Sequence, residues 1–338
     1  MTLNFVLGKN QFDHHQKMME LFNEDFQKDP EGQFFFLVPN HIKFESEVNI
    51  LKSFGNDDDE LIATNNVQTF SFSRLAWYFL RDSGEYNLES LTQTKAAMLL
   101  KEIVQTHKKD LKIFSGMIDK PGFLEQMISQ FNEFMNGQVQ PEDIELVLND
   151  NGQDVFADKI QELNLIYTAY LEQIQNYNTN DFQLNALADF LNTKIKTNHY
   201  HFYIEGFSSF TATELNLVKS LMINSGNLDV SLVLEKSNTN DPTDFYYRAE
   251  STYQQLTDFA KQQQVAIKEY FAQELRISPD LAKLEDYWIQ SSGVGNIKAS
   301  IFDDKRSVQV WRCTDKQTEI SAVSSYIRQM VARQGYRY

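Results

Sequence analysis

The chain has 338 residues, of which 42% are hydrophobic and 13% aromatic, so it is long enough to bury a large core in two or three domains. Its formal net charge of −16 argues against indiscriminate nucleic-acid binding, although a local basic groove on an acidic body stays possible. The single cysteine, Cys313, excludes an internal disulfide and a cysteine metal cluster. No apolar run approaches the ~20 residues of a membrane span, and no signal pattern opens the chain. We therefore expect a cytoplasmic protein with no membrane partner.

Short β-rich runs alternate with helical patterns in the first part of the chain, as in a parallel sheet covered on both faces. Residues 87–198 are instead almost wholly helical in pattern, and the β-rich pattern returns over residues 199–274. We predict an α/β domain, begun by residues 1–86 and completed by 199–274, with a large helical insertion. The expected strands are "NFVLG", "QFFFLVP", "NNVQTF", "HYHFYIEGF", "LDVSLVL" and, much later, "SVQVWRC" from Ser307.

The remainder of the chain carries weaker signals. Residues 275–306 are predicted to be a linker or irregular segment, and residues 307–338 to begin a second domain that the chain truncates. Two later helices have clear patterns. "FTATEL" places Thr211 and Glu214 in a capping box. "TDKQTEISAVSSYIRQM" is amphipathic, and its apolar face consists of Ile320, Val323, Ile327 and Met330.

The segment "GKNQFDHHQ" follows the first strand and precedes a helix, which is the position of a phosphate-binding loop. Such a loop has the pattern G-x-x-x-x-G-K-[ST]. Gly8 fits the first glycine, but Asp13 replaces the second, and His14 and His15 replace the lysine and the hydroxyl residue. Aspartate would repel a triphosphate and hinder the tight turn. We interpret the segment as a degenerate nucleotide site; the alternative is an ordinary strand-to-helix turn.

Two further points bear on a nucleotide or metal site. Adjacent histidines point in different directions on a helix, so His14 and His15 are not expected to share a metal ion. In "HFYIEGFSSF", Glu205 ends a strand, where nucleotide hydrolases hold Mg²⁺, but Gly206 stands where helicases have a second acid. Glu205 is equally interpretable as an acid before a turn. We predict no catalytic residue, no metal and no resident cofactor in this chain.

The segment "TFSFSRLAWYFLR" predicts a helix that begins near Ser71. Arg74, Trp77 and Arg81 then lie together, opposite an apolar stripe. A tryptophan beside two arginines suits base stacking and phosphate contact. The alternative is that Trp77 packs under a neighbouring helix while the arginines lie in solvent. The apolar stripe consists of Phe72, Leu75, Ala76 and Phe79.

Taken together, these segments resemble the N-terminal helicase-like region of the B subunit of AddAB/RexAB-type bacterial helicase–nucleases. The resembling runs follow the family's order and cover the whole chain. The fold that this resemblance implies is P-loop-NTPase-like, of the superfamily 1 helicase type. The runs are "FVLGK", "FFFLVPNHIKFESE", "VQTFSFSRLAWYFL", "YIEGFSSFTATELNLVKSLM" and "EISAVSSYIRQMVARQGYRY".

The resemblance also implies a partner and a function. In this family an A subunit (AddA/RexA-type) carries the motor and one nuclease. The B subunit has a non-motor helicase-like half and a C-terminal nuclease domain with an iron–sulfur cluster, so the full-length subunit is expected to be an ATP-dependent exonuclease that uses Mg²⁺. The complex resects double-strand breaks for recombination, and its B subunit reads a Chi-type hotspot as single-stranded DNA. With one cysteine and no nuclease motif, this chain would be the N-terminal region alone, without catalytic activity.

The resemblance implies DNA-contacting residues as well. Many family members keep an intact phosphate loop, so the departures at Asp13, His14 and His15 put ATP binding in doubt. Two other functions stay open: a scaffold that only holds the A subunit, and an independent ATPase or helicase. The implied DNA contacts are Phe72, Arg74 and Trp77, then His41 and Lys43, which differ in type from the family, and a further stacking ring from Phe207 or Phe210.

Overall fold

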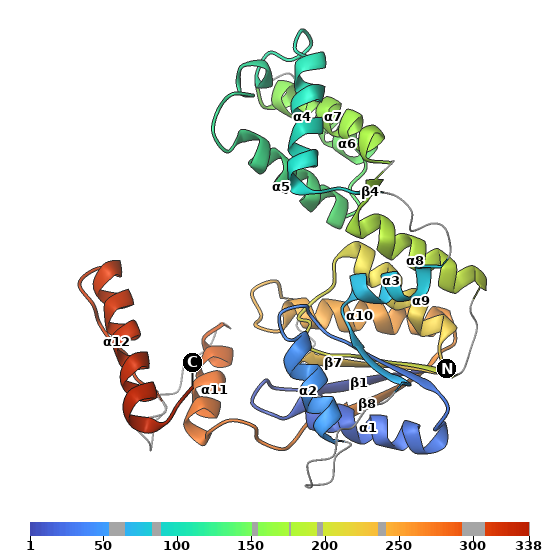
Figure 1. Ribbon diagram of the computed structural model, residues 1–338, viewed down its shortest axis with the longest axis vertical. Coiled ribbons are helices and arrows are strands. Elements are labelled where there is room, and N and C mark those ends of the chain that lie inside the picture. The colour runs from blue at the N-terminus through green and yellow to red at the C-terminus, as the bar shows by residue number, and fades with distance from the viewer. Residues whose placement is uncertain are drawn as a thin grey trace. The chain divides into compact units, whose positions relative to one another are not determined.

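The computed structural model describes residues 1–53, 65–82, 89–150, 155–175, 177–194, 199–235, 241–292 and 308–337. Its contacts divide the chain into two compact units, Met1–Glu274 and Leu275–Tyr338. The first unit contains a six-stranded sheet with helices on both faces and a block of helices with a separate core (Figure 1).

The sheet has the strand order β3-β2-β6-β7-β1-β8, and all pairings between its strands are parallel. The predicted parallel α/β architecture is therefore confirmed. Five of the six strands were predicted from the sequence, and β8 was not. The strands are β1 (Thr2–Gly8), β2 (Gln33–Leu37), β3 (Val67–Phe70), β6 (Tyr200–Ile204), β7 (Asn227–Val233) and β8 (Ala266–Phe271).

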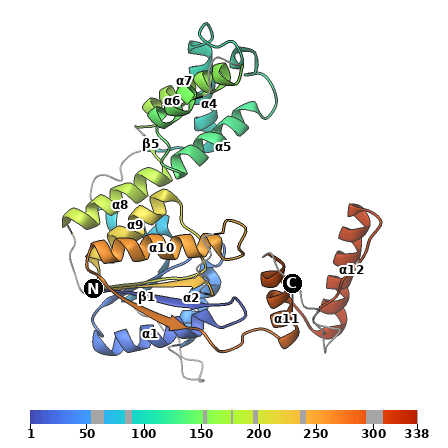
Figure 2. The ribbon, with the colours of Figure 1, turned by 180° about the vertical axis from the view of Figure 1, so that it is seen from behind.

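The direction of each connection places the helices on the two faces of the sheet. The connections after β1 and β2 move toward β3, whereas those after β3, β6 and β7 move the other way. Because crossovers between parallel strands are right-handed, the two groups of helices cover opposite faces, as Figures 1 and 2 show. One face carries α1 (His14–Lys28) and α2 (Lys43–Ser53); the other carries α3 (Phe72–Leu80), α8 (Asn180–Lys194), α9 (Ala212–Asn224) and α10 (Tyr247–Gln262).

Strand β2 explains why the sheet is apolar on both faces. Successive side chains of a strand point to opposite faces. Phe34 and Phe36 pack edge-on against Phe22 of α1, with ring centroids 5.3 and 5.4 Å apart. Phe35 points the other way and packs at 5.7 Å from Phe79 of α3. A strand covered on both faces reads as a continuous apolar run, here "QFFFL".

The helical block has its own core, centred on Phe131, Tyr167 and Tyr170. A short parallel pair, β4 (Glu89–Ser90) and β5 (Tyr177–Asn178), joins its two ends. Helix α8 follows and packs against α3 and α9. The elements of the block are α4 (Gln93–Thr106), the 3₁₀ turn η1 (Phe114–Gly116), α5 (Phe123–Asn136), α6 (Pro141–Asp150) and α7 (Val155–Ile174).

The second unit corrects two predictions. The segment expected to be irregular contains helix α11 (Pro279–Ser292). The described part of the predicted strand, residues 308–313, forms no strand. Helix α12 (Lys316–Gln334) lies where a helix was predicted, and Asp315 caps it by accepting a hydrogen bond from the Thr318 amide. In the described residues of both units, no helix combines the length and apolarity needed to cross a membrane.

Candidate functional site

The residues singled out from the sequence gather at one edge of the sheet. Because all six strands are parallel, their carboxyl ends share an edge, and ligands of such sheets bind there. The loops after β1, β2, β3 and β6 bring four predicted segments to it. Two pairs of neighbouring strands, β1 with β7 and β2 with β6, have connections that leave in opposite directions, which makes their carboxyl ends topological switch points. The four segments are Gly8–His15, His41–Lys43, Phe72–Trp77 and Glu205–Phe210.

The loop after β1 is filled by its own histidine. His14 donates a hydrogen bond from Nε2 to the Lys9 carbonyl oxygen, 3.1 Å away, and its Nδ1 lies 3.0 Å from Ser231 Oγ on β7. Gly8, with φ of 155°, approaches this ring closely: a Cβ there would lie 3.4 Å from His14 Nε2. The imidazole therefore occupies the inside of the turn.

Backbone amides that a phosphate loop would direct at its ligand are engaged within the protein. The Asp13 amide donates to the Glu274 carbonyl at 2.7 Å, and the Phe12 amide donates to the Lys9 carbonyl at 3.1 Å. The Asp13 carboxylate caps α1 by accepting from the Gln16 amide at 2.9 Å. This places a negative side chain at the helix N-terminus, where an anion would otherwise bind. These contacts differ from those of a loop whose amides face a bound phosphate.

His15 and Glu205 form a direct pair between α1 and the end of β6. His15 Nδ1 lies 3.0 and 3.1 Å from the two carboxylate oxygens. The hydrogen bond to Glu205 raises the pKa of His15, against the opposing effect of burial. In a working site these two positions would hold Mg²⁺ between them. Here the two side chains contact each other directly. Within the described residues, no group of three or more His, Cys, Asp or Glu side chains is placed to hold a metal ion.

Gly206 joins the loop after β6 to the loop after β2. Its φ is 82°, a conformation that favours glycine. A Cβ at this position would lie only 2.7 Å from Ile42 Cδ1 and 3.1 Å from Pro39 Cδ. The close approach fixes the turn that carries Phe207 against the turn that carries Ile42, whose neighbours are the predicted contacts His41 and Lys43.

Three phenylalanines form an aromatic cluster at this edge. Phe72 lies 5.1 Å from Phe207 and 6.0 Å from Phe210, and the latter two rings are 5.5 Å apart. Phe72 is only 4% exposed, whereas Phe207 and Phe210 are half-buried. The expectation that Phe72 itself stacks on a base is therefore corrected: its ring is covered and supports the two rings nearer the surface.

Helix α3 displays a tryptophan between two arginines. Ser71 caps the helix by accepting from the Arg74 amide. The Arg74 guanidinium lies 3.8 Å from the centre of the Trp77 ring, and that of Arg81 lies 5.2 Å from it, in cation–π geometry. Both arginines are exposed and Trp77 is half-buried, so the indole is not sealed in the core. Three residues of the predicted apolar stripe are buried, namely Phe72, Leu75 and Ala76. Phe79 is only half-buried, whereas its neighbour Leu80, which was not part of the prediction, is buried.

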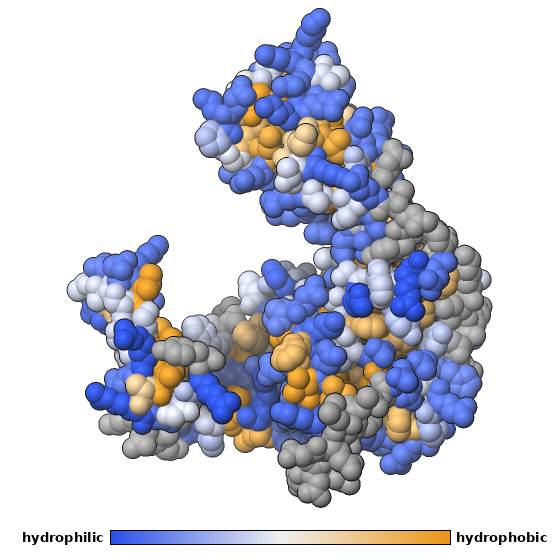
Figure 3. Space-filling model, in the orientation of Figure 1, coloured by the Kyte–Doolittle hydropathy of each residue, from blue (hydrophilic) through white to orange (hydrophobic). Residues whose placement is uncertain are grey.

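Phe44 is an exposed ring at the same edge that was not predicted from the sequence. It lies in the first turn of α2, next to Lys43, and is 80% exposed. Figure 3 shows hydrophobic surface over α2. No signal in "HIKFESE" distinguishes an exposed phenylalanine from a core residue, because only tertiary packing decides which face of a short helix is covered.

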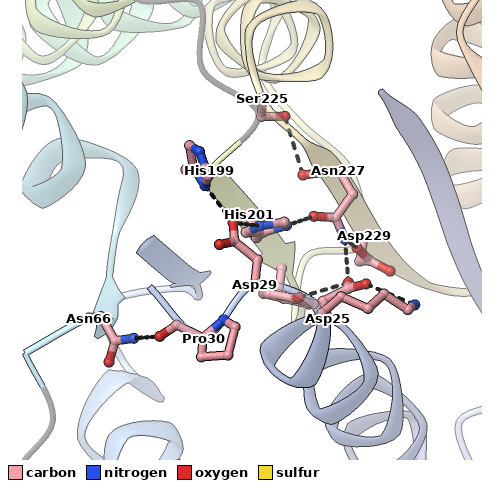
Figure 4. Close-up of polar contacts among 11 residues, drawn as sticks. Asp25, Asp29, Pro30, Asn66, His199, His201, Ser225, Asn227 and Asp229 are labelled. Atoms are coloured by element: carbon pink, nitrogen blue, oxygen red, sulfur yellow. Dashed lines mark hydrogen bonds and ion pairs between the residues drawn. The ribbon is translucent and has the colours of Figure 1, made fainter. Parts of the chain in front are cut away.

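A second polar cluster lies at the opposite, amino-terminal edge of the sheet (Figure 4). Asp29 at the end of α1 accepts from His199 at 2.9 Å and His201 at 3.2 Å. Asn227 donates to Asp25 at 2.6 Å and to Asp229 at 2.5 Å. These residues are hydrogen-bond partners of one another across α1, β6 and β7. We therefore interpret the cluster as a structural network that holds α1 against the sheet.

Together these features define a class: a parallel α/β protein with a separate helical block, an aromatic and cationic carboxyl edge, and a loop after β1 that is occupied by its own histidine. The family model described as ADDB, N-terminal, matches residues 5–285. The chain therefore belongs to the AddB N-terminal family.

Curated relatives agree with this assignment. The chain is 33% identical to a protein of Latilactobacillus sakei, 35% to one of Levilactobacillus brevis and 32% to one of Enterococcus faecalis. All three relatives are named as the B subunit of an ATP-dependent helicase/deoxyribonuclease. The alignments cover 100% of this chain but 29% of each relative, so the chain spans less than a third of their length.

Proposed function

We propose that this chain is the non-motor, helicase-like part of an AddB/RexB-type subunit, and that its carboxyl edge binds single-stranded DNA and reads a Chi-type hotspot. The core would be a superfamily 1 helicase-like P-loop fold with an inserted helical block. Its partner would be the motor-bearing A subunit, in a cytoplasmic complex that resects double-strand breaks for recombination. Exonuclease activity, Mg²⁺ and the iron–sulfur cluster would belong to other parts of the longer subunit, since Cys313 is the chain's only cysteine.

The observation that carries this proposal is the Arg74–Trp77 pair on α3. A half-buried indole beside an exposed guanidinium can stack on a base, while the arginine reaches a phosphate or a guanine edge. His41 in the loop after β2, Lys43 at the start of α2, and Phe207 and Phe210 after β6 extend the same edge. A strand crossing this edge would meet rings and cations in alternation, which suits an acidic protein that contacts DNA only locally.

The test of this function is the substitution Trp77→Ala in the assembled helicase–nuclease. Stacking contributes roughly 1–3 kcal/mol per base, so we expect a loss of about 5- to 150-fold in affinity for the strand. The measurement is photocross-linking of this subunit to a single strand that carries 4-thiothymidine, at increasing protein concentration. Response to the hotspot should weaken while DNA resection continues.

Trp288→Ala is the matched control, because Trp288 is an exposed tryptophan on α11 in the second unit. Its cross-linking should equal that of the unchanged protein. Normal cross-linking and a normal hotspot response in Trp77→Ala would contradict the proposal. If, in addition, substitutions on the protein surface abolished only its assembly with the A subunit, the scaffold function would be favoured.

We also expect this chain to bind no ATP. His14 fills the loop, Asp13 opposes phosphate, and the His15–Glu205 contact takes the place of Mg²⁺. The measurement is labelling of the isolated subunit with an azido-ATP photoprobe in the presence of Mg²⁺. Specific labelling at the loop after β1, competed by ATP, would contradict the expectation, and DNA-stimulated hydrolysis would favour an independent ATPase.

A further inference from the structure

The turn Glu205–Phe210 is held from three sides, and each contact involves a different part of the carboxyl edge. On the main-chain side, the Glu205 amide donates to the Leu37 carbonyl of β2 at 3.1 Å. On the side-chain side, its carboxylate contacts His15 of α1. The next residue, Gly206, lies against Ile42 and Pro39. Glu205 and Gly206 therefore connect the start of α1 with the loop after β2.

The aromatic cluster depends on the same turn. Phe207 follows Gly206 directly and rests on Phe72 of α3, which also contacts Phe210. Phe72 begins the helix that carries Arg74 and Trp77. One connected set of contacts thus runs from the start of α1, through the end of β6, to the rings and cations at the surface.

The His15–Glu205 pair is the polar anchor of this set. Glu205 is 8% exposed, and a buried carboxylate that loses its partner is costly. Without His15, the Glu205 side chain would have to turn toward water, and the turn that begins at Gly206 would have to follow. The surrounding charges favour the cationic form of His15, because Glu205 and the helix cap Asp13 both face it. Lys9 of the same loop pairs elsewhere, with Glu235.

We propose that His15 and Glu205 act as positioning residues for the DNA-contacting edge, and that their direct pair replaces a nucleotide with Mg²⁺ as the fixed link between α1 and β6. This inference rests on the proposed function. Where a motor would couple the shape of its DNA face to nucleotide turnover, this subunit would hold its rings in one arrangement throughout the partner's cycle. Such a permanent arrangement suits recognition of a sequence in a moving strand.

The experiment uses His15→Ala, Glu205→Gln and His15→Lys in the assembled helicase–nuclease, with 4-thiothymidine cross-linking to this subunit as the readout. Uncoupling a connected network typically changes binding by about 2- to 30-fold, and we expect a loss in that range for His15→Ala and Glu205→Gln. His15→Lys should retain most of the affinity, because its ammonium group can reach the carboxylate. The DNA affinity of His15→Lys should also depend less on pH than that of the unchanged protein, because His15 loses its charge as the pH rises through its raised pKa.

Lys17→Ala is the control on the same helix, where it removes an exposed ion pair with Glu20. It should bind like the unchanged protein. Equal losses in His15→Ala and His15→Lys, or losses that only follow a lowered melting temperature, would overturn the inference. So would normal binding in His15→Ala and Glu205→Gln. If Trp77→Ala lost cross-linking in that last case, the proposed function would stand and only the positioning role would fall.

Discussion

Glu162→Ala is expected to lower the free energy of unfolding of the helical block by about 3–5 kcal/mol. Glu162 lies on α7 and is 6% exposed. Its carboxylate accepts hydrogen bonds from three consecutive backbone amides before and in η1: Lys112 at 2.6 Å, Ile113 at 3.0 Å and Phe114 at 3.0 Å. Three converging amides form an anion-binding nest, and here a resident side chain fills it.

The cost follows from what the substitution leaves behind. Alanine removes the acceptor of three N–H groups in a segment whose Phe114 ring is buried in the core of the block. Each buried donor without a partner costs about 1–3 kcal/mol, although water entering the new space would offset part of this. The segment 112–114 would also lose these hydrogen bonds to α7 and would keep the exposed ion pair of Lys112 with Asp158, at 3.9 Å.

The measurement combines thermal unfolding with hydrogen exchange of the three amides. Glu162→Gln should give an intermediate loss, since one oxygen remains but its neighbour becomes a donor that opposes the amides. Glu172→Ala, an exposed position on the same helix, should change stability by less than about 0.5 kcal/mol. Equal and small effects at positions 162 and 172 would show that the nest contributes nothing measurable.

The sequence predicts the interior of the sheet better than its border. Strand β2 is almost continuously apolar because both of its faces are covered. Strand β7 is also buried over most of its length, although Asn227, Asp229 and Ser231 alternate with its apolar residues. Strand β8 is one of the two edge strands; the other, β3, was predicted. Strand β8 is half-buried at most, and Lys268 and Glu269 interrupt its pattern; polar residues of this kind protect edges and hide the strand signal. "SVQVWRC" has the opposite character: β-branched residues alternate, but no neighbouring strand pairs with its described part.

The candidate site was predictable in its location and not in its contacts. Parallel strands bring the loops after β1, β2, β3 and β6 to one edge, and the capping box at Thr211 is a local pattern that the structure confirms. The His15–Glu205 pair joins residues 190 positions apart, so no local pattern reveals it. Phe72 and Phe44 are both phenylalanines at helix starts, yet one is covered and the other exposed. Only the packing of neighbouring loops decides between them.

Asp229→Asn is expected to stabilise the protein at alkaline pH and to remove much of its pH dependence. Asp229 lies in the middle of β7, fully buried, between Asn4 of β1 and Tyr203 of β6. Burial, with a smaller contribution from the nearby Asp25, raises the pKa of Asp229 to about 8, although the amide donors of Asn4 and Asn227 oppose the shift. The folded protein therefore keeps this group protonated near neutral pH.

The sign of the effect follows from proton linkage. Between the ordinary pKa of 3.8 and about 8, the folded state binds a proton that the unfolded state has lost. The free energy of unfolding therefore falls as pH rises through this window, by at most on the order of 5 kcal/mol. The contribution is fully present below the unfolded pKa and is lost by the upper end of the window.

An asparagine has the same shape and never ionises. The buried Asn4 Oδ1 has no hydrogen-bond partner among the described residues, so the Asn4 amide can turn over and accept from the new side-chain amide. We expect the stability difference between Asp229→Asn and the unchanged protein to grow from about pH 5 to about pH 9, as measured by denaturant unfolding at fixed ionic strength. Asp258→Asn, at an exposed position on α10, should keep the original slope. If Asp229→Asn kept that slope as well, the titrating group would have to be another member of the cluster.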